Sequence, residues 1–304
     1  MKVAIVGGAG GTGASIAFNL LLSRTPLDIA IVDSRDPMIT SHLMDFEQAL
    51  ELSPGCSLSR SSDGEVSDAD VVVVTAAAPL TVNTSRLTYL GDNARIVDET
   101  VDRLPPDWAG VVVLVTNPVD PLVTRLTQRT GFDRHRVLGY TINDSLRLRT
   151  GLTKAFGVPP GSVEAWVLGE HGDACVPLLD RVTVNGVARE PTEHEAAAAV
   201  EYLRTWYVRH VALDSGRSST WTTGLGVVRM VLAIVNGGDG VWPASIVLEG
   251  EYGIDSVAVT VPVTLGPGGA ATILEWELTP DQLSSLRVAA ELVRGITASI
   301  GQEV

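Results

Sequence analysis

The sequence predicts an α/β fold that begins with a doubly wound parallel sheet and continues into a second domain of the α+β class. Three observations support this prediction. Strand-length runs of β-branched residues alternate with helix-like stretches over the first half of the chain, a glycine-rich turn follows the first run, and the alternation ends near residue 140. With 304 residues the chain is long enough for two domains, which we expect at residues 1–139 and 140–304.

Four apolar runs form the predicted sheet of the first domain. Apolar residues occupy consecutive positions in each run, as expected for strands that are covered by helices on both faces. Pro118 and Pro121 flank the start of the last helix-like stretch, where proline is tolerated. The resulting βαβα order favours a doubly wound sheet. The predicted strands are residues 2–6, 28–33, 71–75 and 111–116, and the predicted helices are residues 13–24, 39–51, 86–103 and 119–130.

The pattern changes after residue 140. A helical stretch over residues 143–157 leads into an apolar run that ends in an acidic loop at residues 165–173. Apolar residues alternate with small or polar ones over residues 257–269, which predicts an antiparallel hairpin. The sequence has no low-complexity linker, so we expect the two parts to pack closely and to form a site where they meet. Further helices are predicted over residues 192–212, 220–236 and 280–300.

Composition and charge exclude several classes of function. A hydrophobic content of 45% with 19% charged residues is ordinary for a globular protein. The net charge of −14 argues against a nucleic-acid partner or an anionic membrane surface, because both would repel the chain. A small anionic substrate stays compatible with this charge, since one or two arginines can dominate the local field.

The cysteines and the N-terminus indicate a cytoplasmic protein. Cys56 and Cys175 lie far apart and belong to no Cys/His cluster, which fits a reducing compartment and predicts no metal site. Only four apolar residues precede the first glycines, too few for the core of a signal peptide. The sequence also lacks the run of about 18 apolar residues that a transmembrane helix needs.

The glycine-rich turn GGAGGTG contains the pattern Gly8-x-Gly10-x-x-Gly13. The pattern alone is a weak signal, but here a predicted strand precedes it, a helix follows, and the second strand ends in Asp33, twenty residues after Gly13. Glycines let the main chain approach a pyrophosphate, and the helix N-terminus offers unpaired N–H groups. Asp33 would accept hydrogen bonds from an adenosine ribose and repel a 2′-phosphate. The turn therefore predicts a Rossmann domain that prefers NAD, with Arg35 leaving some binding of NADP open.

Three residues of the second half are candidates for catalysis. Asp144 and Arg147 are three positions apart and so share one face of the predicted helix. An exposed salt bridge within the helix is the simple alternative for this pair. His171 lies in the loop GEHGD directly after an apolar run, and its alternative is an ordinary loop histidine. On the functional interpretation, His171 is held at the end of a strand and exchanges a proton with a substrate.

Two residues of the first half complete the candidates. Asn117 follows the fourth predicted strand, at the edge where open α/β sheets bind their ligands. It could instead cap the helix that begins near Pro118. Arg86 lies at the start of a predicted helix, and its alternative is a solvated surface charge.

These segments together resemble the lactate/malate dehydrogenase family over nearly the whole chain. The joint spacing of Asp144, Arg147 and His171 matches the catalytic spacing of that family. The resemblance implies an NAD-dependent oxidoreductase that interconverts a 2-oxo acid and its 2-hydroxy acid. The segments that carry it are GGAGGTG, VVVVTAAAP, NTSRL, VTNPVD, NDSLRLR, WVLGEHGD and YGIDSVAVTVPVTLG.

The resemblance implies a role for each candidate residue. His171 would donate its proton to the carbonyl oxygen of the 2-oxo acid, and Asp144 would accept the other ring N–H and favour the imidazolium. Arg147 would hold the substrate carboxylate through two parallel hydrogen bonds. Arg86 would polarise the carbonyl from a loop that closes over the site, and Asn117 would help to hold substrate and nicotinamide.

The resemblance also implies the cofactor contacts and self-association as a homodimer or homotetramer. No metal ligand is expected. The implied cofactor-binding residues are Gly8, Gly10, Gly11, Thr12, Gly13, Asp33, Thr75, Ala76, Asn93, Thr116 and Asn117.

The sequence departs from the family at the position that selects the substrate. Malate enzymes carry arginine six residues before the loop arginine and lactate enzymes carry glutamine, whereas this chain has Leu80. An unpaired carboxylate desolvated against leucine would cost several kcal/mol. We therefore expect oxaloacetate and malate to be poor substrates and a 2-oxo acid with an apolar side chain to be preferred. Ser219, where lactate enzymes carry threonine, would line the far wall of the substrate pocket.

Other functions stay open at this point. Arg217, two residues before Ser219, could bind a second carboxylate and make the chain a malate dehydrogenase with atypical recognition. The same scaffold could also serve as a non-catalytic NAD sensor. NAD-dependent glycosidases share this type of cofactor domain but need a metal, which the absence of a Cys/His cluster in the sequence argues against.

Overall fold

A single mixed sheet runs through the computed structural model, which describes residues 1–61, 63–78, 86–216, 219–238 and 240–300. The described strands follow the order β3-β2-β1-β4-β5-β6-β10-β11-β7-β8-β9, and β12 pairs with β11. Strands β1 to β6 pair in parallel, in the 3-2-1-4-5-6 order of a dinucleotide-binding sheet. The predicted doubly wound sheet is therefore confirmed.

The elements of the first half are short strands joined by helices. The strands are β1 (Lys2–Val6), β2 (Asp28–Val32), β3 (Ser57–Arg60), β4 (Val71–Val74), β5 (Val111–Leu114) and β6 (Val137–Tyr140). The helices are α1 (Gly11–Leu22), α2 (Asp36–Leu50), α3 (Arg86–Val101) and α4 (Val119–Thr130), with short 3-10 turns η1 (Asp63–Asp68) and η2 (Arg134–Arg136).

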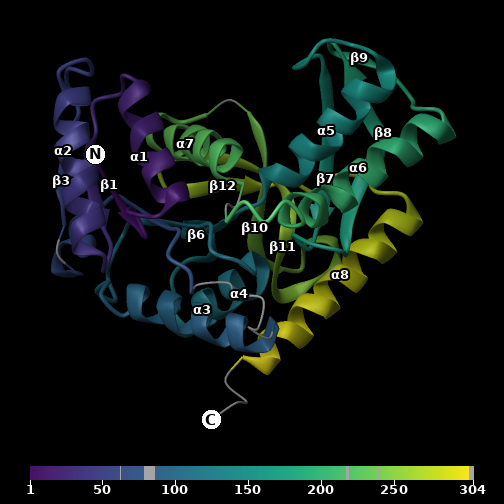
Figure 1. Ribbon diagram of the computed structural model, residues 1–304. Helices are drawn as coiled ribbons and strands as arrows, with labels where there is room; N and C mark the ends of the chain where they lie inside the picture. The colour runs from purple at the N-terminus through teal and green to yellow at the C-terminus, as the bar shows by residue number, and fades with distance from the viewer. Residues whose placement is uncertain (62, 79–85, 217–218, 239, 301–304) are drawn as a thin grey trace.

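Burial on both faces explains why β1, β4 and β5 are apolar at consecutive positions. Alternate residues point to opposite sides, so Val71 and Val73 pack with α1 and α7, while Val72 and Val74 pack with α3 and α4. Figure 1 shows α1 and α7 above this part of the sheet and α3 and α4 below it. The sheet is thus enclosed between two layers of helices.

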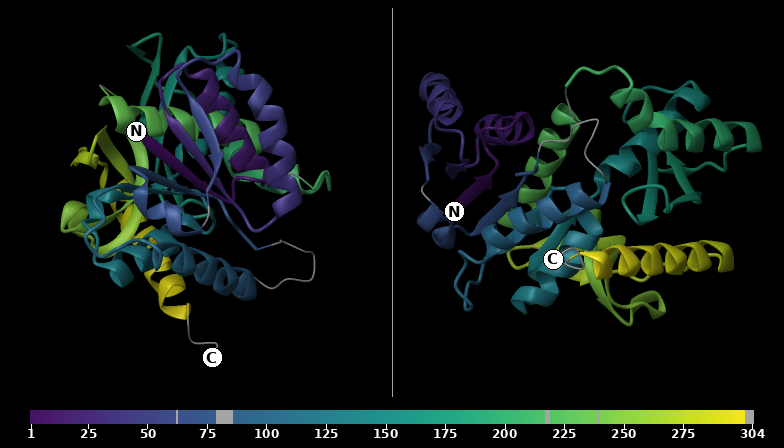
Figure 2. Two further views of the ribbon diagram at one scale, coloured as in Figure 1. Left: turned by 90° about the vertical axis from the view of Figure 1, so that its left-hand side faces the viewer. Right: turned by 60° about the horizontal axis from the view of Figure 1, so that its bottom comes forward.

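The described residues of the second half add the antiparallel part of this sheet and four helices. Its strands are β7 (Val163–Gly169), β8 (Cys175–Val184), β9 (Val187–Ala188), β10 (Val241–Glu249), β11 (Asp255–Gly266) and β12 (Gly269–Ile273). Its helices are α5 (Ile142–Phe156), α6 (Glu193–Val211), α7 (Thr220–Asn236) and α8 (Pro280–Ser299), with a 3-10 turn η3 (Glu251–Gly253). Figure 2 shows α5, α6 and β7–β9 grouped at the end of the molecule opposite α2 and β3.

Two strand predictions for the second half need correction. Residues 257–269 do not form a whole hairpin, because residues 255–266 are one long strand that pairs with β10 on one side and with β12 and β7 on the other. β10 was not predicted, and its Pro243 and buried Ser245 interrupt the usual strand pattern. β10 also pairs with β6, so it joins the parallel and antiparallel parts into one sheet.

Helix α7 crosses back from the second half to cover the first. It packs directly on α1, where a Cβ on Gly224 would overlap the side chain of Ser15. Both helices contribute to the same apolar cluster as β1 and β4. This contact brings Ser219, which directly precedes α7, to the same side of the sheet as the glycine-rich turn. None of the described helices is long and apolar enough to cross a membrane.

Candidate active site

The glycine-rich turn connects β1 to α1 with its main chain closely packed. Gly7 has φ +85°, and a Cβ there would overlap the main chain of Ala76 after β4. A Cβ on Gly13 would overlap the carbonyl oxygen of Gly7. Gly10 caps α1 in an extended conformation, and no side chain caps the helix. The first N–H groups of α1 are therefore available to an anion, so this turn fits the pyrophosphate of a dinucleotide.

Asp33 lies at the end of β2 beside this turn and accepts four hydrogen bonds. Its Oδ2 accepts from the main chain of Ala9 at 3.0 Å and from Arg35 Nη2 at 2.9 Å. Its Oδ1 accepts from Arg35 Nε at 2.9 Å and from the Arg35 main chain at 3.1 Å. Burial alone would raise the pKa of Asp33, but these bonds lower it overall. The carboxylate that we expect to bind ribose is thus charged and is held by Arg35.

Two threonines order the edge of the sheet next to the turn. Thr75 Oγ1 donates to the carbonyl oxygens of Val6 and Gly7 at 3.0 and 3.2 Å. Thr116 Oγ1 donates to the carbonyl oxygen of Ala76 at 2.8 Å. The ends of β1, β4 and β5 are therefore tied to one another where the predicted cofactor residues gather.

Asn93 links this edge to the loop that carries Asn117. The side chain of Asn93 on α3 is fully buried, and its Oδ1 accepts from the main chain of Ala78 at 2.7 Å. Its Nδ2 donates to the carbonyl oxygen of Asn117 at 2.7 Å. Asn93 therefore orients the main chain of Asn117, whereas Asn117 itself is exposed at the carboxyl end of β5.

Asp144, Arg147 and His171 come together between α5 and the loop after β7. Nδ1 of His171 lies 2.5 Å from Oδ2 of Asp144, and Arg147 Nη1 donates to Oδ1 of the same carboxylate at 2.9 Å. The three side chains are 14%, 10% and 16% exposed for His171, Asp144 and Arg147. Ser145 fixes α5 against β7 by accepting the main-chain N–H of Val167 at 3.0 Å. The sequence spacing thus corresponds to a real contact in space.

The surroundings of His171 favour its charged form. Burial alone would lower the pKa of His171, but the charge and hydrogen bond of Asp144 raise it overall. Because Nδ1 donates to Asp144, Nε2 is the ring nitrogen that can exchange a proton with a ligand. The arrangement can therefore hold a proton on Nε2 beside an anion-binding guanidinium.

Two further residues contact this cluster and were not singled out from the sequence. The carboxylate of Asp120, 1% exposed on α4, accepts the main-chain N–H of His171 at 2.6 Å. Acidic residues are common in the first turn of a helix because they interact favourably with its dipole, so nothing local distinguishes Asp120 as a site residue. The ring of Trp206 on α6 lies over the guanidinium of Arg147. One tryptophan in an alanine-rich helix carries no local signal of this contact.

Several predicted residues have a limited structural description. Leu80 and Arg217 lie outside the described residues. Arg86 is the first residue of α3, and its side chain is also outside the description. Ser219 is half-buried and precedes α7 without a side-chain capping bond.

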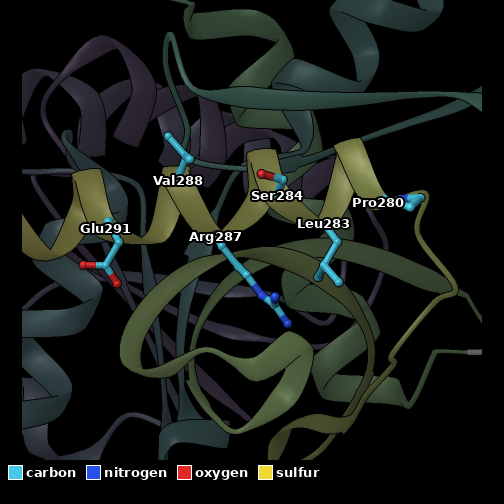
Figure 3. A pocket seen from close by; sticks show the side chains of 6 residues that line it. All are labelled: Pro280, Leu283, Ser284, Arg287, Val288 and Glu291. Atoms are coloured by element: carbon cyan, nitrogen blue, oxygen red, sulfur yellow. The ribbon is translucent and has the colours of Figure 1, made fainter.

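The structure also has features away from this cluster. A groove of about 480 Å³ runs beside α8 (Figure 3) and contains no predicted site residue. Its lining residues are Pro280, Leu283, Ser284, Arg287, Val288 and Glu291. Within the described part of the chain, no group of three or more His, Cys, Asp or Glu side chains could hold a metal ion.

Comparisons with known proteins agree over the full length. Residues 1–139 match the lactate/malate dehydrogenase NAD binding domain, and residues 141–300 match the lactate/malate dehydrogenase alpha/beta C-terminal domain. A malate dehydrogenase of Halobacterium salinarum is 37% identical over 95% of this chain and 96% of its own length. An L-lactate dehydrogenase of Mycoplasma mobile is 30% identical over 97% of this chain and 95% of its own. The malate dehydrogenase structure from Aeropyrum pernix superposes with a TM-score of 0.91 at 27% identity, covering 100% of this chain and 99% of that one.

Proposed function

Since the chain belongs to the lactate/malate dehydrogenase family and is an NAD-dependent hydroxy acid dehydrogenase, we propose that His171 exchanges the proton of its reaction. The observation that carries the proposal is the buried contact between His171 and Asp144, with Arg147 bonded to the same carboxylate. A proton donor and an anion-binding fork next to each other are what reduction of a 2-oxo acid requires.

His171 carries the proton and Asp144 holds its ring in place. Bound NADH supplies the hydride for the carbonyl carbon of the substrate. Nε2 of His171 donates its proton to the carbonyl oxygen, so that the carbonyl group becomes the hydroxyl group of the 2-hydroxy acid. The reverse reaction returns this proton to Nε2. The raised pKa of His171 keeps the imidazole protonated before reduction, and Asp144 fixes the ring through Nδ1.

Arg147 binds the substrate carboxylate in this proposal. A guanidinium can hold a carboxylate through two parallel N–H donors, which lysine cannot reproduce. Its bond to Asp144 links the substrate clamp to the proton donor through one side chain. Arg86 would polarise the carbonyl, and Asn117, oriented by Asn93, would contact substrate and nicotinamide.

We assign residues 1–139 to cofactor binding and residues 140–304 to substrate binding. Gly8, Gly10 and Gly13 let the main chain reach the pyrophosphate. Asp33 accepts hydrogen bonds from the ribose hydroxyls once Arg35 no longer donates to both oxygens of the Asp33 carboxylate. The remaining proposed cofactor contacts are Gly11, Thr12, Thr75, Ala76, Asn93, Thr116 and Asn117.

The substrate that we propose is a 2-oxo acid with an apolar side chain. The proposal rests on Leu80, which cannot pair a second carboxylate. A malate dehydrogenase that uses Arg217 is the second candidate, supported by the 37% identity to a relative that is itself a malate dehydrogenase. Ser219 would contact the substrate side chain in either case.

A substrate panel tests these proposals. Initial rates are measured with NADH and with NADPH on pyruvate, 2-oxoisocaproate, phenylpyruvate and oxaloacetate, for the wild type, Leu80→Arg and Arg217→Ala. We expect oxaloacetate to be the slowest substrate and Leu80→Arg to improve it. Fast reduction of oxaloacetate that Arg217→Ala abolishes would instead establish the second candidate.

In His171→Asn we expect turnover to be lost while NADH still binds. Turnover retained in this variant would rule out His171 as the proton donor.

We further propose that the protein is a cytoplasmic homo-oligomer. Large apolar side chains are exposed on α1, α2 and α7, which a second copy of the chain could cover. Light scattering measures the mass in solution, and a monomer at micromolar concentration would contradict the proposal. The exposed side chains are Phe18, Leu22, Met38, Met44, Trp221 and Leu225.

A further inference from the structure

A buried carboxyl group lies directly behind the proposed proton donor. Asp120 is the second residue of α4 and is 1% exposed. Its Oδ2 accepts the main-chain N–H of His171 at 2.6 Å, across 51 residues of chain. His171 is therefore held by two carboxylates: Asp144 binds its ring and Asp120 binds its main-chain N–H.

The other side of Asp120 faces the hydroxyl group of Ser245. Ser245 on β10 and Thr260 on β11 are direct partners across the two strands, and both are buried. Oδ1 of Asp120 and the hydroxyls of Ser245 and Thr260 have no well-aligned hydrogen bond to any described residue. Ser245 is nevertheless close enough to lower the pKa of Asp120. A buried carboxyl group with an unpartnered oxygen costs folding free energy, whatever its function.

The charges around this group couple Asp120 to His171. Burial raises the pKa of Asp120 to about 7, with a smaller increase from Glu170, and Ser245 and His171 oppose both. Asp120 in turn raises the pKa of His171 in addition to Asp144, while Arg147 lowers it. A charged Asp120 and a protonated His171 therefore stabilise each other.

We propose that Asp120 is a positioning residue for proton transfer, which fixes the main chain of His171 and adds a second negative charge that keeps the imidazole protonated. The inference rests on the proposed role of His171. Asp120 gains its charge near neutral pH, and at higher pH this charge opposes loss of the proton from His171. The protein can then reduce its substrate at a higher pH than Asp144 alone would allow.

The variant Asp120→Asn removes the negative charge of Asp120 and leaves its shape unchanged. The amide keeps an oxygen that can accept the N–H of His171, and offers an NH₂ group to the hydroxyl of Ser245. Reduction requires protonated His171 and oxidation requires the neutral form, so kcat/KM is measured against pH in both directions. We expect the midpoint of both profiles to fall by about half a unit or more. Reduction then becomes about threefold slower at pH values well above both midpoints, and oxidation about threefold faster at pH values well below them.

Asp173→Asn is the matched control, because Asp173 is exposed two residues after His171. It likewise removes one carboxylate, here from the loop that carries His171, and we expect both midpoints to stay at the wild-type pH. A structural defect in Asp120→Asn would slow both directions alike at every pH. That result, or an unchanged midpoint, would overturn the inference.

Ser245→Ala provides a second readout that leaves Asp120 in place, should the asparagine variant fold poorly. Removing the hydroxyl raises the pKa of Asp120, so the carboxylate carries less charge at a given pH. The midpoint for His171 should then fall, as in Asp120→Asn, but by a smaller amount. An unmoved midpoint in a folded Ser245→Ala variant counts against the inference.

The His171→Asn variant separates this inference from the proposed function. Retained turnover in His171→Asn would overturn the proposed function itself. An inactive His171→Asn together with an unshifted Asp120→Asn profile overturns only the role of Asp120.

Discussion

The guanidinium carbon of Arg147 lies 4.3 Å from the centre of the Trp206 ring. The ring of His210, one helical turn further along α6, stacks on the same indole with 4.9 Å between centroids. Helix α6 therefore supports the guanidinium that we propose as the carboxylate clamp, and the flat ring restricts the plane in which Arg147 can turn.

Removing this ring should weaken substrate binding alone. In Trp206→Leu we expect KM for the 2-oxo acid to rise about tenfold, since a cation–π contact contributes on the order of 1–2 kcal/mol. We expect kcat and the affinity for NADH to stay near wild type. Trp206→Phe keeps an aromatic face and should recover most of the affinity. Weaker NADH binding in Trp206→Leu would show instead that α6 had moved as a whole.

Replacing Asp144 should shift the pH profile further than replacing Asp120. In Asp144→Asn the largest influence that raises the pKa of His171 is lost, so the imidazole is neutral at a lower pH. We expect reduction near neutral pH to fall by about 10²-fold and its alkaline limb to move to lower pH. The pH dependence of kcat/KM measures both effects. A slow variant whose limb stays at the wild-type pH would contradict the assigned role of Asp144.

Arg35 should influence the choice of cofactor. Its side chain occupies both oxygens of Asp33 and would have to release them to the ribose of NAD. In Arg35→Ala we expect the preference for NADH over NADPH, as a ratio of kcat/KM values, to rise about tenfold, the size of one charge-assisted hydrogen bond. Arg60→Ala is the control, because Arg60 pairs with Asp36 instead. An unchanged ratio in Arg35→Ala would mean that Arg35 leaves the ribose site in the wild type.

The ion pair of Arg134 with Glu251 should stabilise the fold in a pH-dependent way. Partial burial alone would raise the pKa of Glu251, but Arg134 and main-chain bonds lower it to about 2. A depressed carboxyl pKa adds stability above the unfolded value of 4.5, and this stability is lost as the pH falls toward 2. We expect Glu251→Gln to lower Tm by about 2–4 °C at pH 7 and the difference to disappear near pH 2.

Glu249→Gln provides the comparison for this pair. Glu249 also contacts Arg134, at 3.4 Å, but its side chain is 66% exposed. An exposed pair contributes little, so we expect Tm at pH 7 to stay within about 1 °C of the wild type. An equal decrease of Tm in Glu251→Gln and Glu249→Gln would show that burial does not distinguish the two carboxylates.

Long buried elements were predictable because their patterns are local. The helix predicted over residues 119–130 is α4 (Val119–Thr130), and the one predicted over residues 220–236 is α7 (Thr220–Asn236). The unpredicted β3 and β10 lack such a pattern. β3 is largely exposed and polar at the sheet edge, and β10 contains a proline and a buried serine.

The sequence by itself determined the chemistry of the candidate site. The glycine turn with Asp33 predicts a dinucleotide, and Asp144, Arg147 and His171 at their spacing predict a proton donor beside an anion clamp, because these predictions rest on residue type and local spacing. Only the tertiary structure showed that Asp120 holds His171, that Trp206 covers Arg147 and that Arg35 occupies Asp33. Asp120 and Trp206 lie far along the chain from the residues they contact, and Arg35 reaches Asp33 only through the rotamer it adopts. Such contacts depend on how helices and strands pack, and they produce no periodic pattern in the sequence from which they could be predicted.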